Sequence, residues 1–199
     1  MKAQVKNDQL LRALNNATLF KGDDARPLLQ STEMTFVDAT TIRFVTTDSY
    51  ALLHETVEAE VPEEMVGQTR LVNLVDAKPM LAALKANDKF GATLLELGDD
   101  RTSVTFEEIG SRATFVQKVE GTFPNWQMLV KEWDGVKESP TLGIGLWQLA
   151  RLAKLRPVEA WKSGDHDVAG GFEIIDNLNP IRVTIGHAIW VMVMPVKLP

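Results

Sequence analysis

The sequence predicts an α+β fold built from three copies of one unit, which is a strand, a helix and three further strands. Two observations predict it. Three amphipathic helical segments are each followed by about three short β-like runs. Turn residues separate these runs. Internal repetition of this kind restricts the architecture more than any single element does.

The first copy begins with a helix and shows no clear leading strand. We expect Asn7-Asp8 to cap this helix and Gly22 to end it, with Leu10, Leu11, Leu14 and Ala17 on one face. Residues 31–60 then change to β-like runs, with breaks at Asp38-Ala39 and at Thr47-Asp48-Ser49.

The second copy repeats this order after a polar loop from Pro62 to Gln68. A short strand at residues 70–75 precedes a helix that Asp76 is expected to cap, with Pro79 in its first turn and Met80, Leu81 and Leu84 on one face. Strand-like runs follow at residues 92–97, 103–108 and 113–119.

The third copy starts with a short strand at residues 142–145. Its helix is expected to use one apolar face, made of Leu146, Leu149, Leu152, Ala153 and Leu155. Strands are then predicted at residues 172–175, 181–185 and 189–194. The last run is six apolar residues long and reads as a strand buried on both faces. Because Pro195 has no N–H to donate, pairing should weaken there.

Composition excludes several classes of protein. The absence of cysteine excludes disulfides, thiolate metal sites and cysteine catalysis. The N-terminus has no apolar signal core, and no apolar run approaches the ~18 residues of a membrane span. We therefore expect a soluble, cytoplasmic protein. A net charge of −6 argues against a simple basic DNA-coating protein unless the positive charge is segregated.

The sequence offers little support for an enzyme, and we expect no cofactor. It contains no phosphate-binding P-loop and no nucleophile elbow, and Gly143-Ile-Gly145 lacks the third glycine of a dinucleotide fingerprint. Asp165-His166-Asp167 could bind a metal weakly, but a polar loop is the better interpretation. A metal-dependent enzyme that uses these three residues is a distant alternative.

Positive charge is concentrated on the three predicted helices. Residues 6–21, 76–89 and 146–156 carry net charges of +2, +1 and +3, so the remainder of the chain carries −12. A solvated helix face usually mixes both signs. Segregation of this kind suits a protein that turns its helices toward a polyanion and its acidic strands and loops toward water.

Four local motifs resemble the bacterial DNA polymerase III beta subunit, the sliding clamp. They are Asp24-Ala-Arg-Pro-Leu-Leu29, Thr46-Thr-Asp-Ser-Tyr-Ala-Leu52, Gly121-Thr-Phe-Pro-Asn-Trp126 and Val193-Met-Pro-Val-Lys-Leu198. The resemblance implies a DNA-clamp fold with antiparallel sheets outside and basic helices on one face. Residues 1–130 resemble the complete middle domain of the clamp, and residues 131–199 resemble only the second half of its last domain.

In the clamp family, partner proteins insert a short apolar peptide between the middle and last domains. The matching partner-peptide positions here are Leu29, Thr47, Ser49, Tyr50, Leu52, Pro124, Met128, Leu129, Met192, Val193, Met194, Pro195, Val196, Lys197 and Leu198. Tyr50 and Met128 replace a family histidine and arginine, and Ala51 replaces another arginine, so the preferred peptide should differ. The alternative is that these residues simply pack the interface between repeats.

The resemblance also implies sequence-independent binding of duplex DNA through the helices. Candidate contacts are Arg12, Lys21, Arg26, Lys78, Lys85, Lys89, Arg151, Lys154 and Arg156. We expect a non-catalytic processivity factor for a DNA polymerase, in a compact form that suggests a phage or mobile element. Since the usual ring has twelve repeats, three per chain would need a homotetramer. The alternative is a clamp-derived decoy or regulator that binds replication proteins without encircling DNA.

Overall fold

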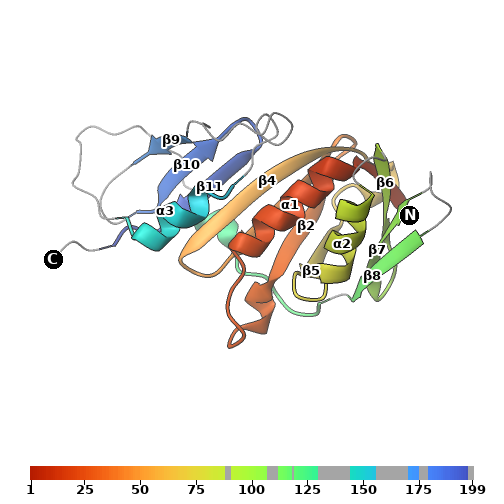
Figure 1. Cartoon of the computed structure of the whole chain (residues 1–199), viewed down its shortest axis with the longest axis horizontal. Coiled ribbons are helices and arrows are strands. Elements are labelled where there is room, and N and C mark those ends of the chain that lie inside the picture. The colour runs from red at the N-terminus through yellow and green to blue at the C-terminus, as the bar shows by residue number, and fades with distance from the viewer. Residues whose placement is uncertain are drawn as a thin grey trace.

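The computed structural model describes residues 1–87, 91–106, 112–117, 119–129, 144–155, 170–174 and 179–196. The three α-helices of the described residues lie on the same side of an antiparallel sheet and follow one another along the long axis of the molecule in the order α3, α1, α2 (Figure 1). Their bounds are Asn7–Leu19 for α1, Lys78–Ala86 for α2 and Leu146–Leu152 for α3. Within the described ranges, no helix is long and apolar enough to cross a bilayer.

The described strands pair in antiparallel fashion. They are β1 (Lys2–Lys6), β2 (Ser31–Asp38), β3 (Thr41–Thr47), β4 (Ala51–Glu60), β5 (Thr69–Asn73), β6 (Ala92–Leu97), β7 (Arg101–Phe106), β8 (Arg112–Gln117), β9 (Gly170–Glu173), β10 (Ile181–Ile185) and β11 (Ile189–Val193). Short 3₁₀ turns are η1 (Pro27–Gln30), η2 (Glu63–Met65) and η4 (Trp126–Leu129).

The first two units exchange their leading strands. β5, which opens the second unit, pairs with β2 of the first, and β1, which opens the first unit, pairs with β6 of the second. The path of hydrogen-bonded strands is therefore β5-β2-β3-β4-β1-β6-β7-β8. Neither unit completes its sheet alone, so the two units form one structural body.

The third unit joins this body through β4. The first half of β4, residues 51–55, pairs with β11, while Ala59 and Glu60 at its other end pair with β1. On its opposite edge β4 pairs with β3 along most of its length. One ten-residue strand thus pairs with β3 along one edge and with β11 and β1 along the other, and it fixes the third unit relative to the first two.

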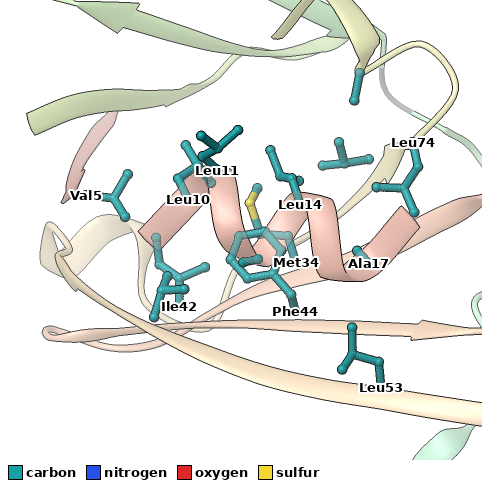
Figure 2. Close-up of a cluster of buried hydrophobic side chains, with 14 of the residues drawn as sticks. Val5, Leu10, Leu11, Leu14, Ala17, Met34, Ile42, Phe44, Leu53 and Leu74 are labelled. Carbon is teal, nitrogen blue, oxygen red and sulfur yellow. The ribbon is translucent and has the colours of Figure 1, made fainter. Parts of the chain in front are cut away.

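The core lies between the helices and the sheet. Figure 2 shows Leu10 and Leu14 of α1 lying over Met34, Ile42 and Phe44 of β2 and β3, all of them buried. Spacings of three and four residues along α1 put its leucines on one face, and alternation along the strands puts Met34, Ile42 and Phe44 on the facing side. The predicted apolar faces of α1 and α2 are therefore confirmed as core, with Leu81 partly buried.

Several local predictions were wrong. The first unit does have a leading strand, β1, with Ala3 and Val5 buried between exposed neighbours. Asn7 is not a cap but the first residue of α1, and Asp76 does not cap α2, which begins after Ala77 with Pro79 in its first turn. The side-chain amide of Asn7 is buried and donates to the carbonyl oxygens of Leu84 and Asn87, linking α1 to the end of α2.

The apolar face predicted for the third helix is only partly the buried one. Leu155 is buried and Leu152 is half-buried, but Leu146 and Leu149 are exposed and Gln148 is buried in their place. The predicted leading strand of this unit falls mostly outside the described residues, and Ile144 and Gly145 are not in a strand. The division between residues 130 and 131 also lies outside the described ranges.

Candidate functional site

The C-terminal strand ends beside the turn that joins β3 to β4. Met192 and Val193 pair with Leu52 and Ala51, and beyond the strand the backbone N–H of Met194 donates to the carbonyl oxygen of Tyr50 at 3.1 Å. β11 ends at Val193, just before Pro195, and only an isolated bridge at Val196 follows in the described residues. The predicted weakening of pairing at this proline is confirmed.

The β3–β4 turn is held in shape by its own side chains. The Asp48 carboxylate accepts from the backbone N–H groups of Tyr50 and Ala51 at 2.9 and 2.8 Å. The Thr47 hydroxyl donates to the Ala51 carbonyl oxygen and accepts from the N–H of Ser49. Ser49 has φ of +78°, which a non-glycine residue adopts only where its surroundings enforce it. The turn therefore presents the Tyr50 side chain in one defined place.

Two arginines hold the turn from outside. Arg26 donates to the Ser49 hydroxyl at 2.9 Å, and Arg151 of α3 donates to the second oxygen of Asp48 at 2.6 Å. Arg151 also donates to the carbonyl oxygen of Leu19 and lies 4.1 Å from the centre of the Phe20 ring. Burial lowers the pKa of Arg151, and the Asp48 carboxylate opposes that shift. Arg151 thus joins the third unit to the first.

A layer of aromatic side chains covers the outer face of the sheet next to the turn. Phe123 and Trp126 pack with Leu52 and Met192 in a second apolar cluster, separate from the main core. The Trp126 indole donates to Glu33 at 2.9 Å, which fixes η4 against β2. The Gly121–Trp126 motif and the end of β11 are therefore brought together around the same strands.

We call the predicted partner-peptide residues that are not buried the tail site; those that the structure describes are Ser49, Tyr50, Pro124, Met128, Met194, Pro195 and Val196. Four large apolar residues of this group are exposed, with relative exposures between 41% and 74%: Tyr50, Met128, Met194 and Val196. Pro195 is half-buried. Other predicted partner-peptide residues lie beneath this surface, buried: Leu29, Thr47, Leu52, Met192 and Val193. Lys197, Leu198 and the side chain of Leu129 lie outside the described part of the chain.

Trp147 at the start of α3 was not predicted to belong to this site. Its ring meets that of Tyr50 edge-on, with centroids 6.4 Å apart, and half of its surface is exposed. No local pattern predicts this contact, because nearly a hundred residues separate the two aromatic residues along the chain. Trp147 extends the apolar surface of the tail site toward α3.

A stack of rings lies on the same outer face. His54 stacks on Trp190, with centroids 4.4 Å apart, and meets the edge of Trp126, while Arg43 and Arg182 lie over the two indoles. Burial, followed by the positive charge of Arg43 and Arg182, lowers the pKa of His54 to about 4. His54 is therefore neutral at pH 7 and acts as a packing residue.

The predicted DNA contacts fall into different environments. Lys78, Lys85 and Lys154 are exposed on or next to α2 and α3, Arg26 is partly exposed and Lys21 is half-buried. Lys89 and Arg156 lie outside the described residues. Two predictions need correction because the side chains are used internally: Arg12 and Arg151.

Arg12 is buried on the inner side of α1, with 1% of its side chain exposed. Its Nε lies 2.7 Å from a carboxylate oxygen of Glu55, which is fully buried, and Asn16 donates to the other oxygen at 3.0 Å. Burial raises the pKa of Glu55, while Arg12 and Asn16 lower it. A guanidinium in this position cannot reach a phosphate, so Arg12 is a structural residue.

The metal-site alternative, Asp165-His166-Asp167, lies outside the described residues. Among the residues that are described, no group of three His, Cys, Asp or Glu side chains could hold a metal ion.

Comparison with solved structures shows that the chain has the sliding-clamp fold. It aligns with the DNA polymerase III beta subunit of Thermotoga maritima over 100% of its length and 66% of that chain, with a TM-score of 0.76 and 12% identity. The sliding clamp of Caulobacter crescentus aligns with 99% of this chain and 65% of its own, with a TM-score of 0.70 and 13% identity.

A third sliding clamp, from Pseudomonas aeruginosa and bound to griselimycin, aligns over 100% of this chain and 66% of its own, with a TM-score of 0.72 and 15% identity. The chain thus spans about two thirds of the length of the clamps it matches. A comparison with protein families finds no match, and neither does a comparison with curated proteins.

Proposed function

We propose that this chain is a non-catalytic, sliding-clamp-like processivity factor for a DNA polymerase. It encircles or cradles duplex DNA in the cytoplasm and binds partner peptides at the tail site. The observation that supports the proposal is that η4 packs against β4 and β11 through Trp126, Leu52 and Met192, beside the β3–β4 turn, on a clamp fold. In this proposal residues 1–130 form a complete clamp domain and residues 131–199 a half-domain.

The chemistry of the tail site suits an apolar peptide. Tyr50, Met128, Met194 and Val196 offer exposed apolar side chains above a fixed turn, and the flexible methionines can pack around different ligands. Each buried leucine or phenylalanine of a partner contributes roughly 1.5–3 kcal/mol. Two or three such anchors, less the cost of ordering them, give roughly micromolar affinity for an isolated peptide.

The peptide proposal is tested by fluorescence anisotropy with a labelled clamp-binding-motif peptide. Val196→Asp places a charge at the tail site and should weaken binding at least ~10-fold, since the partner would bury that charge. Val37→Asp is a matched control, because Val37 and Val196 are valines with similar exposure, 40% and 44%. If the two variants bind the peptide with equal affinity, the tail site is not the peptide-binding site.

DNA binding is proposed to be electrostatic and independent of sequence. Lys78 and Lys85 of α2 are exposed on the helical side of the sheet, where DNA would lie. Reversing both to Glu should weaken binding to duplex DNA at ~50 mM salt and flatten its salt dependence. A control that reverses Lys2 and Arg101, on β1 and β7, changes net charge equally. If both variants lose the same affinity for duplex DNA, the exposed face of α2 is not a specific DNA-binding surface.

The second candidate function is a clamp-derived decoy that binds clamp partners without encircling DNA. One observation favours it: Arg12 and Arg151 are engaged by Glu55 and Asp48, so the helices offer fewer free cations than their sequence implies. Mass measurement in solution separates the two functions. A closed homo-oligomer, four chains for a twelve-unit ring, supports the processivity factor, and a monomer that binds the peptide supports the decoy.

A further inference from the structure

The first two units show how such units complete one another. α1 packs against α2, and each unit receives the leading strand of the other at the edge of its own sheet, β5 on β2 and β1 on β6. Asn7, the first residue of α1, is buried by its contact with the end of α2. Within the chain, a unit is thus buried against a second unit.

The helices of the first and third units can be matched residue by residue. α1 begins Asn7-Asp-Gln-Leu-Leu-Arg12 and α3 begins Leu146-Trp-Gln-Leu-Ala-Arg151, with glutamine, leucine and arginine at the same three positions. The two glutamines have the same inward orientation, since Gln9 and Gln148 are 7% and 3% exposed. The two helices therefore turn the same side to their sheets.

Two of the matched positions differ sharply in exposure. Asn7 and Leu10 of α1 are each 1% exposed, whereas their equivalents on α3, Leu146 and Leu149, are 83% and 38% exposed. Leu146 thus stands where α1 carries Asn7, a residue that α2 covers, and Leu149 stands where α1 carries the buried Leu10. Leucines that are exposed at positions buried elsewhere in the same chain indicate a contact surface.

The sheet of the third unit is open on the same side. Among the described strands β9 pairs only with β10, whereas its equivalents β2 and β6 each pair with a leading strand from the other unit. Phe172 of β9 lies opposite Val183, on the core-facing side, yet half of its surface is exposed. In the part of the chain that the structure describes, no second unit covers the helix or the outer strand of the third unit.

We propose that this face, formed by Leu146, Leu149 and Phe172, packs against the same face of a second copy of the chain. We choose a second copy because the first and second units of this chain each pack against another unit of the same kind. The third unit has no such partner unit among the described residues of its own chain. A two-fold contact between two third units forms one complete domain, as the first and second units do.

The contact does not depend on DNA or peptide binding, and it extends the proposed function. A pair joined in this way carries six units, an arc of three complete domains. Two such arcs supply the twelve units of a ring, and the tail sites lie outside the paired faces. A chain that forms no ring could still form this pair. Failure of the proposed processivity function can therefore be distinguished from failure of the pairing proposal.

Sedimentation velocity of the full chain at ~1 to 100 µM tests the pairing. The wild type should be a dimer or an even multiple of it, and Leu146→Lys with Leu149→Lys should weaken that association at least 100-fold. Val37→Lys, on β2 of the first unit, should leave it unchanged. A monomeric wild type, or a double variant that assembles like the wild type, overturns the proposal.

A second measurement tests the pairing without relying on the double lysine variant, which could fold poorly. Because the chain has no cysteine, Leu146→Cys introduces a single thiol whose labelling rate reports its exposure. Labelling of this thiol should slow at least 10-fold between ~1 and 100 µM protein, while that of Val37→Cys should not change. Concentration-independent labelling of Leu146→Cys contradicts the pairing, whatever the sedimentation result.

Discussion

Removing the negative charge opposite Arg12 should be one of the most damaging single changes in this protein. Glu55→Gln keeps the size of the side chain and the contact with Asn16 but leaves the guanidinium of Arg12 buried without a counter-charge. Both side chains of the pair are at most 1% exposed, so water cannot replace the lost carboxylate. Breaking a buried pair from one side costs about 3–5 kcal/mol.

The reverse change should behave differently. Arg12→Met leaves Glu55 unpaired, but a carboxyl group can take up a proton, whereas a guanidinium cannot release one. Burial already raises the pKa of Glu55, and loss of Arg12 should raise it further. Since the folded-state pKa then exceeds the unfolded value, Arg12→Met loses stability relative to wild type as pH rises from 5 to 7, by up to ~1.4 kcal/mol per unit.

Urea unfolding followed by circular dichroism at pH 5, 6 and 7 measures both effects. Glu55→Gln should show a large loss with no added pH slope, and Arg12→Met a loss that grows with pH. The double variant Arg12→Met with Glu55→Leu should be within ~2 kcal/mol of wild type, because no charge stays buried. A cost below ~1 kcal/mol for Glu55→Gln would refute the reasoning, since it would mean that solvent reaches Arg12.

Three further predictions concern the links between units and the outer face. The free energy of unfolding should fall by about 3 kcal/mol between pH 6.5 and 4, because the unfolded chain protonates His54 before the folded one does; His54→Phe should remove this slope in urea titrations. Arg151→Met should remove the ion pair with Asp48 and speed hydrogen exchange in α3 at least ~10-fold, with exchange in α2 as the internal control. Gly121→Ala should cost about 1–3 kcal/mol in thermal or urea unfolding, because φ is +134° and the new methyl group would lie 3.0 Å from Leu28; a neutral effect would mean that this loop relaxes freely.

Much of the fold could be predicted because the signals are local. The runs at residues 31–60 alternate and are separated by turn residues, and the observed strands β2, β3 and β4 follow them closely. β1 was missed although Lys2–Lys6 alternates perfectly, because two small or aliphatic side chains among polar ones give a weak apolar signal. The repeat was the stronger guide, since each unit constrained the next.

The candidate site could be predicted only at positions that belong to one of the four sequence motifs. The motifs named the β3–β4 turn, η4 and the end of β11, but nothing in them separates surface residues such as Met128 from residues beneath it such as Leu52. The role of Arg12 depends on Glu55, a residue 43 positions away, and a single sequence does not show such a pairing. A basic residue on a helix has the same local pattern whether it meets phosphate or a buried carboxylate.

The shared strand β4 also sets the order in which the protein is assembled during synthesis. Residues 51–60 leave the ribosome well before β11, so the first two units can form while the third is still being made. Until β11 arrives, Ala51–Glu55 is an unprotected edge, and an open edge invites pairing with other chains. A product that stops before residue 189 is therefore expected to aggregate. In the finished chain, β11 occupies the edge of β4 and prevents it from pairing with other chains.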